Sequence, residues 1–104
     1  MATDTATSQS AGVVNFATGS FTSDNTACTV TLGFVARAVK VVNSTDTIVW
    51  EKIEGMAAAN CIKVTSTTQS VETSSDILIN SAGTLTLSQT LVGNAKAISW
   101  AAWG

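Results

Sequence analysis

The fold class is set by residues 27–53, which read ACTVTLGFVARAVKVVNSTDTIVWEKI. Alternate residues of the first part, 27–34, place four apolar side chains on one face: Cys28, Val30, Leu32 and Phe34. The opposite face carries only small and polar residues. This period of 2 is typical of a half-buried β-strand. The pattern therefore predicts a strand over 27–34.

The second part of this stretch predicts a β-hairpin. Residues 37–43 alternate around Val39 and Val41, and residues 47–53 form a second alternating run. In that run, two sets of side chains fall on opposite faces: Ile48, Trp50 and Lys52 against Val49, Glu51 and Ile53. Asn43-Ser44-Thr45-Asp46 lies between the runs, and such residues favour turns because their side chains bond their own backbone.

Outside this hairpin the same pattern recurs in short pieces. Further strands are expected at 61–65, 69–73, 77–80, 84–88 and 97–103, with turns at 81–83 and 93–94. Residues 55–60 predict a loop with room for one helical turn. Seven to nine short antiparallel strands without a convincing helix predict an all-β fold, a compact β-sandwich or a jelly-roll-like small barrel. We expect one such domain over 13–104, preceded by a flexible N-terminal arm over 1–12.

The composition supports a β fold and excludes several functions. Of the 104 residues, 45% are hydrophobic and only 12% are charged, whereas threonine (17) and serine (12) supply most of the polar side chains. Threonine is β-branched, which favours strands over helices. The net charge of −2 leaves no basic surface for phosphates, so nucleic-acid binding is disfavoured.

The ends and the cysteines suggest where the protein is made. Residues 1–11 contain neither the basic region nor the apolar region of a signal peptide, and no apolar run is long enough to cross a membrane. We therefore expect synthesis in a cytosol and no membrane partner. Cys28 and Cys61 are then expected to be reduced and to act as small buried hydrophobes, in preference to a disulfide or a chemical role.

Catalytic patterns are missing from the sequence. It contains no histidine, no Cys-x-x-Cys pair and no glycine-rich phosphate loop. Its carboxylates are expected to be solvated or to cap turns: Asp24, Asp46, Asp76, Glu51 and Glu54. We therefore expect no catalytic residue, no metal and no cofactor.

The tryptophans and the strand edges point instead to binding. Trp100 and Trp103 fall on opposite faces of the last expected strand, so one belongs to the core and the other to the surface or an interface. The chain has no proline to protect strand edges, which are then expected to be covered by other subunits. A homotrimer or homodimer follows from this.

Three segments carry a resemblance to known proteins: residues 32–43 (LGFVARAVKVVN), residues 47–51 (TIVWE) and residues 54–57 (EGMA). They resemble small virion proteins of tailed bacteriophages, which are similar in length. Those proteins read Gly-Phe-x-Pro-Arg-x-Val-x-Val-x-Asn, then a hairpin with an aromatic residue, then Gly-Met-Ala. The match covers roughly residues 27 to 103, and Ala36 stands where the family has proline.

The resemblance implies a head decoration, or cement, protein located on the capsid surface of a virion and made in the host cytoplasm. Its partners would be the major capsid protein and further copies of itself. The residues that we expect to contact a partner are Trp103, Arg37 and, in the arm, Thr3, Asp4 and Thr5. The alternative is a receptor- or glycan-binding module of a tail or spike, in which Trp50, Trp100 or Trp103 would stack on sugar rings.

Overall fold

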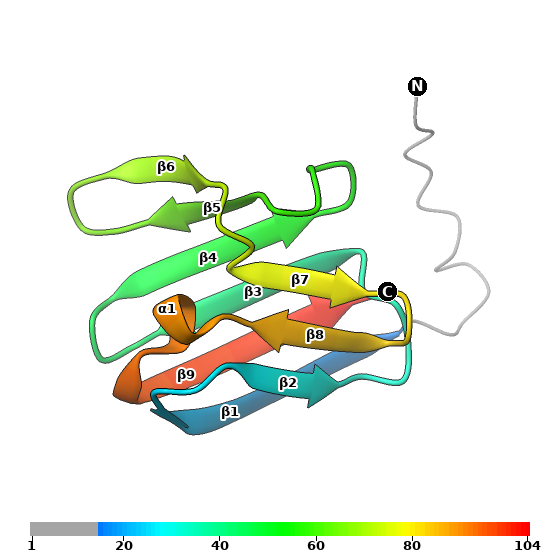
Figure 1. Ribbon diagram of the computed structural model, residues 1–104, viewed down its shortest axis with the longest axis horizontal. Coiled ribbons are helices and arrows are strands. Elements are labelled where there is room, and N and C mark those ends of the chain that lie inside the picture. The colour runs from blue at the N-terminus through cyan, green and yellow to red at the C-terminus, as the bar shows by residue number, and fades with distance from the viewer. Residues whose placement is uncertain (1–14) are drawn as a thin grey trace.

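The computed structural model describes residues 15–104, which form two packed β-sheets (Figure 1). The expected arm at 1–12 lies outside the described residues. In chain order the elements are β1 (Phe16–Asp24), β2 (Cys28–Thr31), β3 (Ala38–Asn43), β4 (Ile48–Ile53), β5 (Cys61–Val64), β6 (Gln69–Glu72), β7 (Ile77–Asn80), β8 (Thr84–Leu87), α1 (Gln89–Val92) and β9 (Asn94–Trp103).

The two sheets differ in size. The larger has the strand order β1-β9-β3-β4-β5-β6, and the smaller has the order β2-β8-β7. Every strand pair is antiparallel. The smaller sheet lies over one face of the larger one, and β5 and β6 extend beyond it (Figure 1). The predicted all-β sandwich is confirmed, with nine strands.

The core lies between the sheets and follows the alternation of the sequence. From β3, Val39 and Val41 are buried, while Lys40 between them is exposed. The predicted hairpin is present, because Ala38 pairs with Ile53 and Asn43 pairs with Ile48. The buried hydrophobic residues from both sheets and from α1 form one cluster: Ala36, Val39, Val41, Trp50, Cys61, Ile77, Leu85, Leu87, Leu91, Val92, Ile98 and Ala102.

Some expected strands have different limits. The strand predicted over 27–34 ends at Thr31, because Gly33 adopts a φ of +82° that breaks the extended backbone. Leu32 and Phe34 nevertheless pack against the core from the following bend, so the predicted inward face is correct. The last strand begins at Asn94, three residues before the predicted 97, and therefore replaces part of the turn expected at 93–94.

β1 and α1 were not assigned from the sequence. The inward side of β1 is small at its centre, where the ring of Trp100 lies against Gly19; a Cβ built at Gly19 would stand 2.6 Å from that ring. The large residue that completes this part of the core thus comes from β9, some 80 residues away. α1 is a single turn capped by Ser88, whose side-chain oxygen accepts from the backbone N–H of Leu91.

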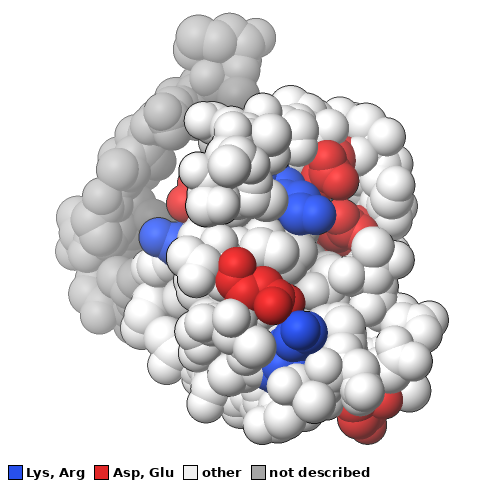
Figure 2. All heavy atoms as spheres, turned by 90° about the vertical axis from the view of Figure 1, so that its left-hand side faces the viewer, with Lys and Arg blue, Asp and Glu red and all other residues white. Residues whose placement is uncertain are grey.

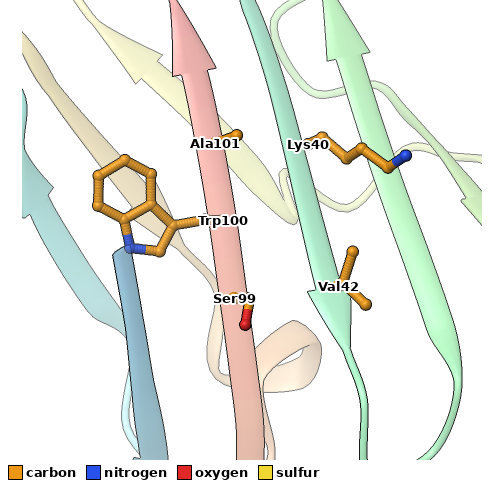
Figure 3. A pocket seen from close by; sticks show the side chains of 5 residues that line it. All are labelled: Lys40, Val42, Ser99, Trp100 and Ala101. Atoms are coloured by element: carbon orange, nitrogen blue, oxygen red, sulfur yellow. The ribbon is translucent and has the colours of Figure 1, made fainter. Parts of the chain in front are cut away.

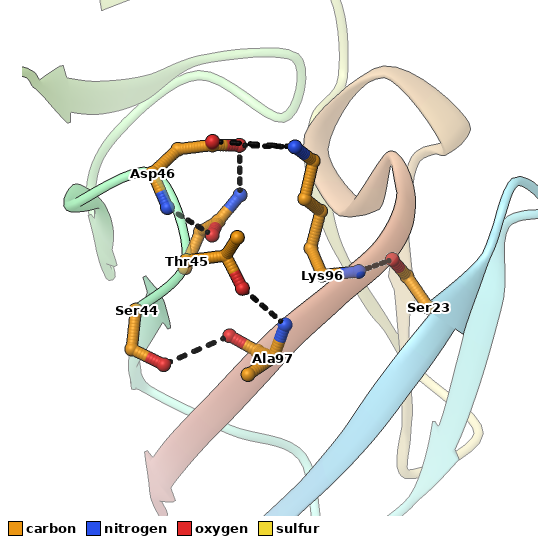
Figure 4. A network of polar contacts seen from close by, with 7 residues as sticks. Ser23, Ser44, Thr45, Asp46, Lys96 and Ala97 are labelled. Carbon is orange, nitrogen blue, oxygen red and sulfur yellow. Dashed lines mark hydrogen bonds and ion pairs between the residues drawn. The ribbon is translucent and has the colours of Figure 1, made fainter.

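The turn of the β3–β4 hairpin is fixed to β9 by polar contacts (Figure 4). Asp46 pairs with Lys96 at 3.1 Å, and the Thr45 hydroxyl accepts from the backbone N–H of Ala97 at 2.9 Å. The Asn43 side chain accepts from the backbone N–H of Asp46, as expected for a turn of this composition. These contacts tie the start of β9 to the hairpin.

Residues 54–60 form turns without a helix, and Lys52 holds them in place. The side chain of Lys52 is only 4% exposed, and its Nζ donates to the carbonyl oxygens of Ala57, Ala58 and Asn60 at 2.9, 3.1 and 2.6 Å. An ammonium group has three donors, so the three carbonyls satisfy it completely.

Among the described residues, no helix is long and apolar enough to cross a membrane.

We expect Lys52→Met to lower the free energy of unfolding by about 3 kcal/mol, because it removes the three charged hydrogen bonds that hold the loop at residues 57–60. The matched control is Lys63→Met, since Lys63 lies 5.8 Å from the centre of the Trp50 ring and its loss removes only a cation–π contact worth about 0.5–1 kcal/mol. Urea denaturation of both variants measures the difference. Equal losses would contradict the role given to Lys52.

Candidate functional site

Charged side chains are few and isolated on the described surface. Figure 2, which views the molecule from the left-hand side of Figure 1, shows small groups of blue and red separated by uncharged surface. Within residues 15–104, no group of three or more His, Cys, Asp or Glu side chains is placed to hold a metal ion. A site on this surface would therefore act through shape and apolar contact more than through charge.

Three titratable side chains are buried inside the protein: Lys52, Cys61 and Asp76, each at most 4% exposed. Burial, followed by the nearby Asp76 carboxylate, raises the pKa of the Cys61 thiol above its ordinary 9.0. Burial lowers the pKa of Lys52 below 10.5. Asp76 accepts from the Ser88 hydroxyl at 2.9 Å. A thiol with a raised pKa is a weak nucleophile at neutral pH.

Two of the predicted partner-binding residues, Trp103 and Arg37, lie together at one end of the larger sheet. The backbone N–H of Arg37 donates to the carbonyl of Trp103 at 2.6 Å. The Arg37 guanidinium pairs with Glu54 at 3.1 Å, and both of these side chains are more than half exposed. Trp103 is 38% exposed and points away from the smaller sheet. No local pattern in the sequence indicates that Arg37 and Trp103 are neighbours.

An apolar row crosses the sheet at this end. Phe16 is directly opposite Trp103, Trp103 is opposite Ala38, and Ala38 is opposite Ile53. The Phe16 and Trp103 ring centroids are 5.5 Å apart. Phe16 and Ile53 are 53% and 59% exposed, so this row presents large apolar groups to solvent. Such a patch marks an interaction surface more often than a single exposed residue does.

The sequence contains a strand pattern around Ile53 but none around Phe16. The alternation places Ile53 on the face opposite Trp50, but it does not say which of the two faces is outward. Phe16 was missed, because the residues around it show no apolar alternation and no strand was expected there. Exposure of Phe16 beside Trp103 arises only from the pairing of β1 with β9.

The predicted arm residues Thr3, Asp4 and Thr5 lie outside the described residues. The structure does fix the point where that segment joins the domain. The carbonyl of Asn15 accepts from the backbone N–H of Gly104 at 2.9 Å, so residue 15 sits beside the C-terminus and next to the Phe16–Trp103 pair. The segment therefore joins the domain at the same sheet end as Arg37.

The other two tryptophans belong to the interior. Trp50 is 2% exposed, and Trp100 packs against the core and against Gly19. The expectation that Trp100 and Trp103 would divide between core and surface is confirmed. Both cysteines are free thiols, with Cys61 buried and Cys28 half-buried against the core.

No family model, curated protein sequence or solved structure matches this chain.

The buried thiols make stability depend on pH in a defined direction. Burial, together with Asp24, also raises the pKa of Cys28 above 9.0. Because the folded protein then keeps thiol protons that the unfolded chain releases, stability should fall as the pH rises above about 9. Lys52 acts in the opposite direction, since with a lowered pKa its unfolded form binds more protons.

Replacing both cysteines by alanine removes the contribution of the thiols to the pH dependence of stability and keeps the contribution of Lys52. We expect the free energy of unfolding to fall less between pH 8 and pH 10 in Cys28→Ala/Cys61→Ala than in the unsubstituted protein. Guanidinium denaturation under reducing conditions at the two pH values provides the measurement. A drop of the same size in both proteins would assign the alkaline loss to other groups.

Proposed function

We propose that this protein is a non-enzymatic structural protein of a bacteriophage virion, a decoration or cement protein that binds the outside of the major capsid shell and stabilises it. The observation that supports this most is the place of the residues that resemble phage virion proteins. Residues 32–43 and 47–51 make up the β3–β4 hairpin and its entry, and Arg37 and Glu54 are paired at the sheet end beside Trp103.

The chemistry of this sheet end suits a role in assembly. Exposed Phe16, Trp103 and Ile53 can bury apolar surface against a partner, and the Arg37–Glu54 pair can orient that partner at the rim. A protein that binds only the assembled shell stabilises the shell by mass action and needs no reaction. The proposed partners are the major capsid protein and further copies of this chain.

The segment that precedes Asn15 joins the domain at the sheet end and could supply further contacts with the capsid. Twelve residues span at most about 40 Å when fully extended. From the sheet end at Asn15, such a segment can cross onto a neighbouring capsomer. The residues of this segment that we propose as contacts with the capsomer are Thr3, Asp4 and Thr5.

The alternative, a receptor- or glycan-binding module of a tail or spike, finds less support. Sugar rings stack on the faces of exposed aromatic side chains. Among the three tryptophans, only Trp103 is exposed, and its neighbour on the surface is Phe16 at an interplanar angle of 46°. One partly exposed tryptophan is a small platform for a carbohydrate.

The location of the protein on intact virions separates the two functions. We expect antibodies against the purified protein to label the faces of phage heads in electron micrographs. Label confined to tail tips would support the receptor-binding alternative and overturn the decoration proposal. Absence of label from virions that package normally would overturn both.

The binding surface can be tested by sedimentation with expanded capsids. We expect deletion of residues 1–12 to leave the Tm of the free protein nearly unchanged and to weaken capsid binding, because the segment precedes β1 and its core contacts. Arg37→Gln should weaken binding by about tenfold, the effect of one lost charged contact.

The matched control is Lys96→Gln, which also breaks an ion pair but at the opposite end of the sheet, beside the β3–β4 turn. Equal binding of the deletion variant and the full chain would show that the segment plays no part. Equal effects of Arg37→Gln and Lys96→Gln would remove the sheet end at Arg37 from the proposal.

A further inference from the structure

The outer face of the six-stranded sheet is covered by none of the described elements. Strand register divides it into three rows of side chains, which together we name the open face: Phe16-Trp103-Ala38-Ile53, Thr18-Ala101-Lys40-Glu51-Ile62-Val71, and Ser20-Ser99-Val42-Val49-Val64-Gln69. Apolar side chains dominate it, and Ile53 and Val71 are 59% and 58% exposed. A face of this kind is normally buried against a second layer.

The charges of the open face occupy its centre. Within its three rows, the charged side chains are Lys40 on β3 and Glu51 on β4, which are direct neighbours in the middle row. Their Nζ and Oε1 atoms are 3.8 Å apart, and both side chains are about half exposed. An exposed pair of this kind adds little to the stability of its own chain. Both groups keep the capacity to pair with a second layer.

We propose that the open face is the interface of a homodimer in which two copies pack their larger sheets face to face. The twofold axis runs parallel to the strands and passes between β3 and β4. This axis places Lys40 of each copy over Glu51 of the other, so both charges are matched. An axis across the strands through the middle row would place Lys40 over Lys40 and Glu51 over Glu51, and the repulsion disfavours that arrangement.

The shapes of the two halves of the open face complement each other under the same axis. Outside the first row, where Phe16 and Trp103 are exposed, the half made by β1, β9 and β3 is low, with Ala101 and Ser99 at its centre. A shallow hollow of about 170 Å³ lies there (Figure 3). It is lined by Lys40, Val42, Ser99, Trp100 and Ala101. The Trp100 ring points toward β1 and away from the other lining side chains (Figure 3). The floor of the hollow is therefore made of small residues.

The half made by β4, β5 and β6 is raised. Its rows carry the larger aliphatic side chains Val49, Ile53, Ile62, Val64 and Val71. Rotation about the proposed axis brings β5 of one copy over β9 of the other. Ile62 and Val64 then lie opposite Ala101 and Ser99, where the hollow is. Each copy contributes one raised half and one low half, as a self-complementary twofold interface requires.

The size of the open face is sufficient for a dimer. With strands about 4.8 Å apart and about 3.4 Å of rise per residue, six strands and three rows present roughly 500–600 Å². Two such faces bury a total of about 1,000–1,200 Å², near the lower limit of specific interfaces. Sheets pack face to face at a separation of about 10 Å, which suits side chains of this size. The inference concerns the free protein and does not rest on the proposed capsid role.

The test measures the oligomeric state of the purified full chain at tens of micromolar by sedimentation velocity. We expect a dimer for the unsubstituted protein and at least about a tenfold weaker dimer for Lys40→Glu, which places like charges in register. Lys63→Glu is the matched control, because it makes the same change in net charge on the inner face of β5, where Lys63 contacts Trp50. It should remain dimeric.

Mixing two charge-reversed variants provides a test that depends on a gain of binding and not on its loss. Lys40→Glu and Glu51→Lys should each be largely monomeric and should form a heterodimer when combined, because opposite charges then face each other across the interface. Ala101→Phe, which fills the hollow, should also dissociate the dimer, with an unchanged circular dichroism spectrum. A monomeric or trimeric unsubstituted protein, or a dimer that ignores Lys40→Glu and Ala101→Phe, would overturn the proposal.

The capsid assay keeps this result separate from the proposed function. If the free protein is monomeric and Lys40→Glu instead reduces sedimentation with expanded capsids, the open face binds the capsid protein and the dimer proposal is wrong. If the dimer forms but no capsid binding is found, the decoration role fails and the dimer stands.

Discussion

The pairing of β9 with both β1 and β3 is the interaction on which the rest of this structure depends. β9 is the longest and the last strand, whereas both of its neighbours, β1 and β3, come from the N-terminal half of the chain, so this pairing joins distant segments in the larger sheet. It buries Ile98 and Ala102 beside Val39 and Val41, and it lays the Trp100 ring over Gly19. Loop closure over such separations costs entropy that only this buried surface offsets.

The same pairing creates both candidate surfaces. Because alternate residues of β9 face opposite sides, burying Ala102 exposes Trp103 next to Phe16, and the backbone bond from Arg37 adds the charged rim. Because β9 and β3 also carry Ala101, Ser99 and Lys40 outward, their pairing makes the low half of the open face. The register of β9 against β1 and β3 thus determines both the apolar row at the sheet end and the hollow on the open face.

The two-layer arrangement explains why the outer face of the larger sheet is left uncovered. The smaller sheet and the single turn α1 both pack on the inner face of the larger sheet, where α1 adds Leu91 and Val92 to the core, so neither covers the outer face. The larger sheet therefore keeps one face with a single ion pair among mainly apolar and small side chains. The proposed virion partner contacts the end of this sheet and the proposed second copy covers its face, so both would bury the Phe16 row, whereas the Arg37–Glu54 pair lies outside the open face.

The sequence determined the strands of the β3–β4 hairpin, the inward face of residues 28–34 and the opposite orientation of Trp100 and Trp103. These are local properties, because the period of 2 and the turn residues act over a few positions of the chain. It also determined the candidate residues Trp103 and Arg37, but only as separate positions. Tertiary structure alone decided that these two meet, that Phe16 joins them, that Lys52 is held by three carbonyls of its own loop, and that Lys40 and Glu51 stand at the centre of an uncovered face. Each of these depends on which strands become neighbours and in which register, and that choice is made by burial between distant segments, which no local pattern records.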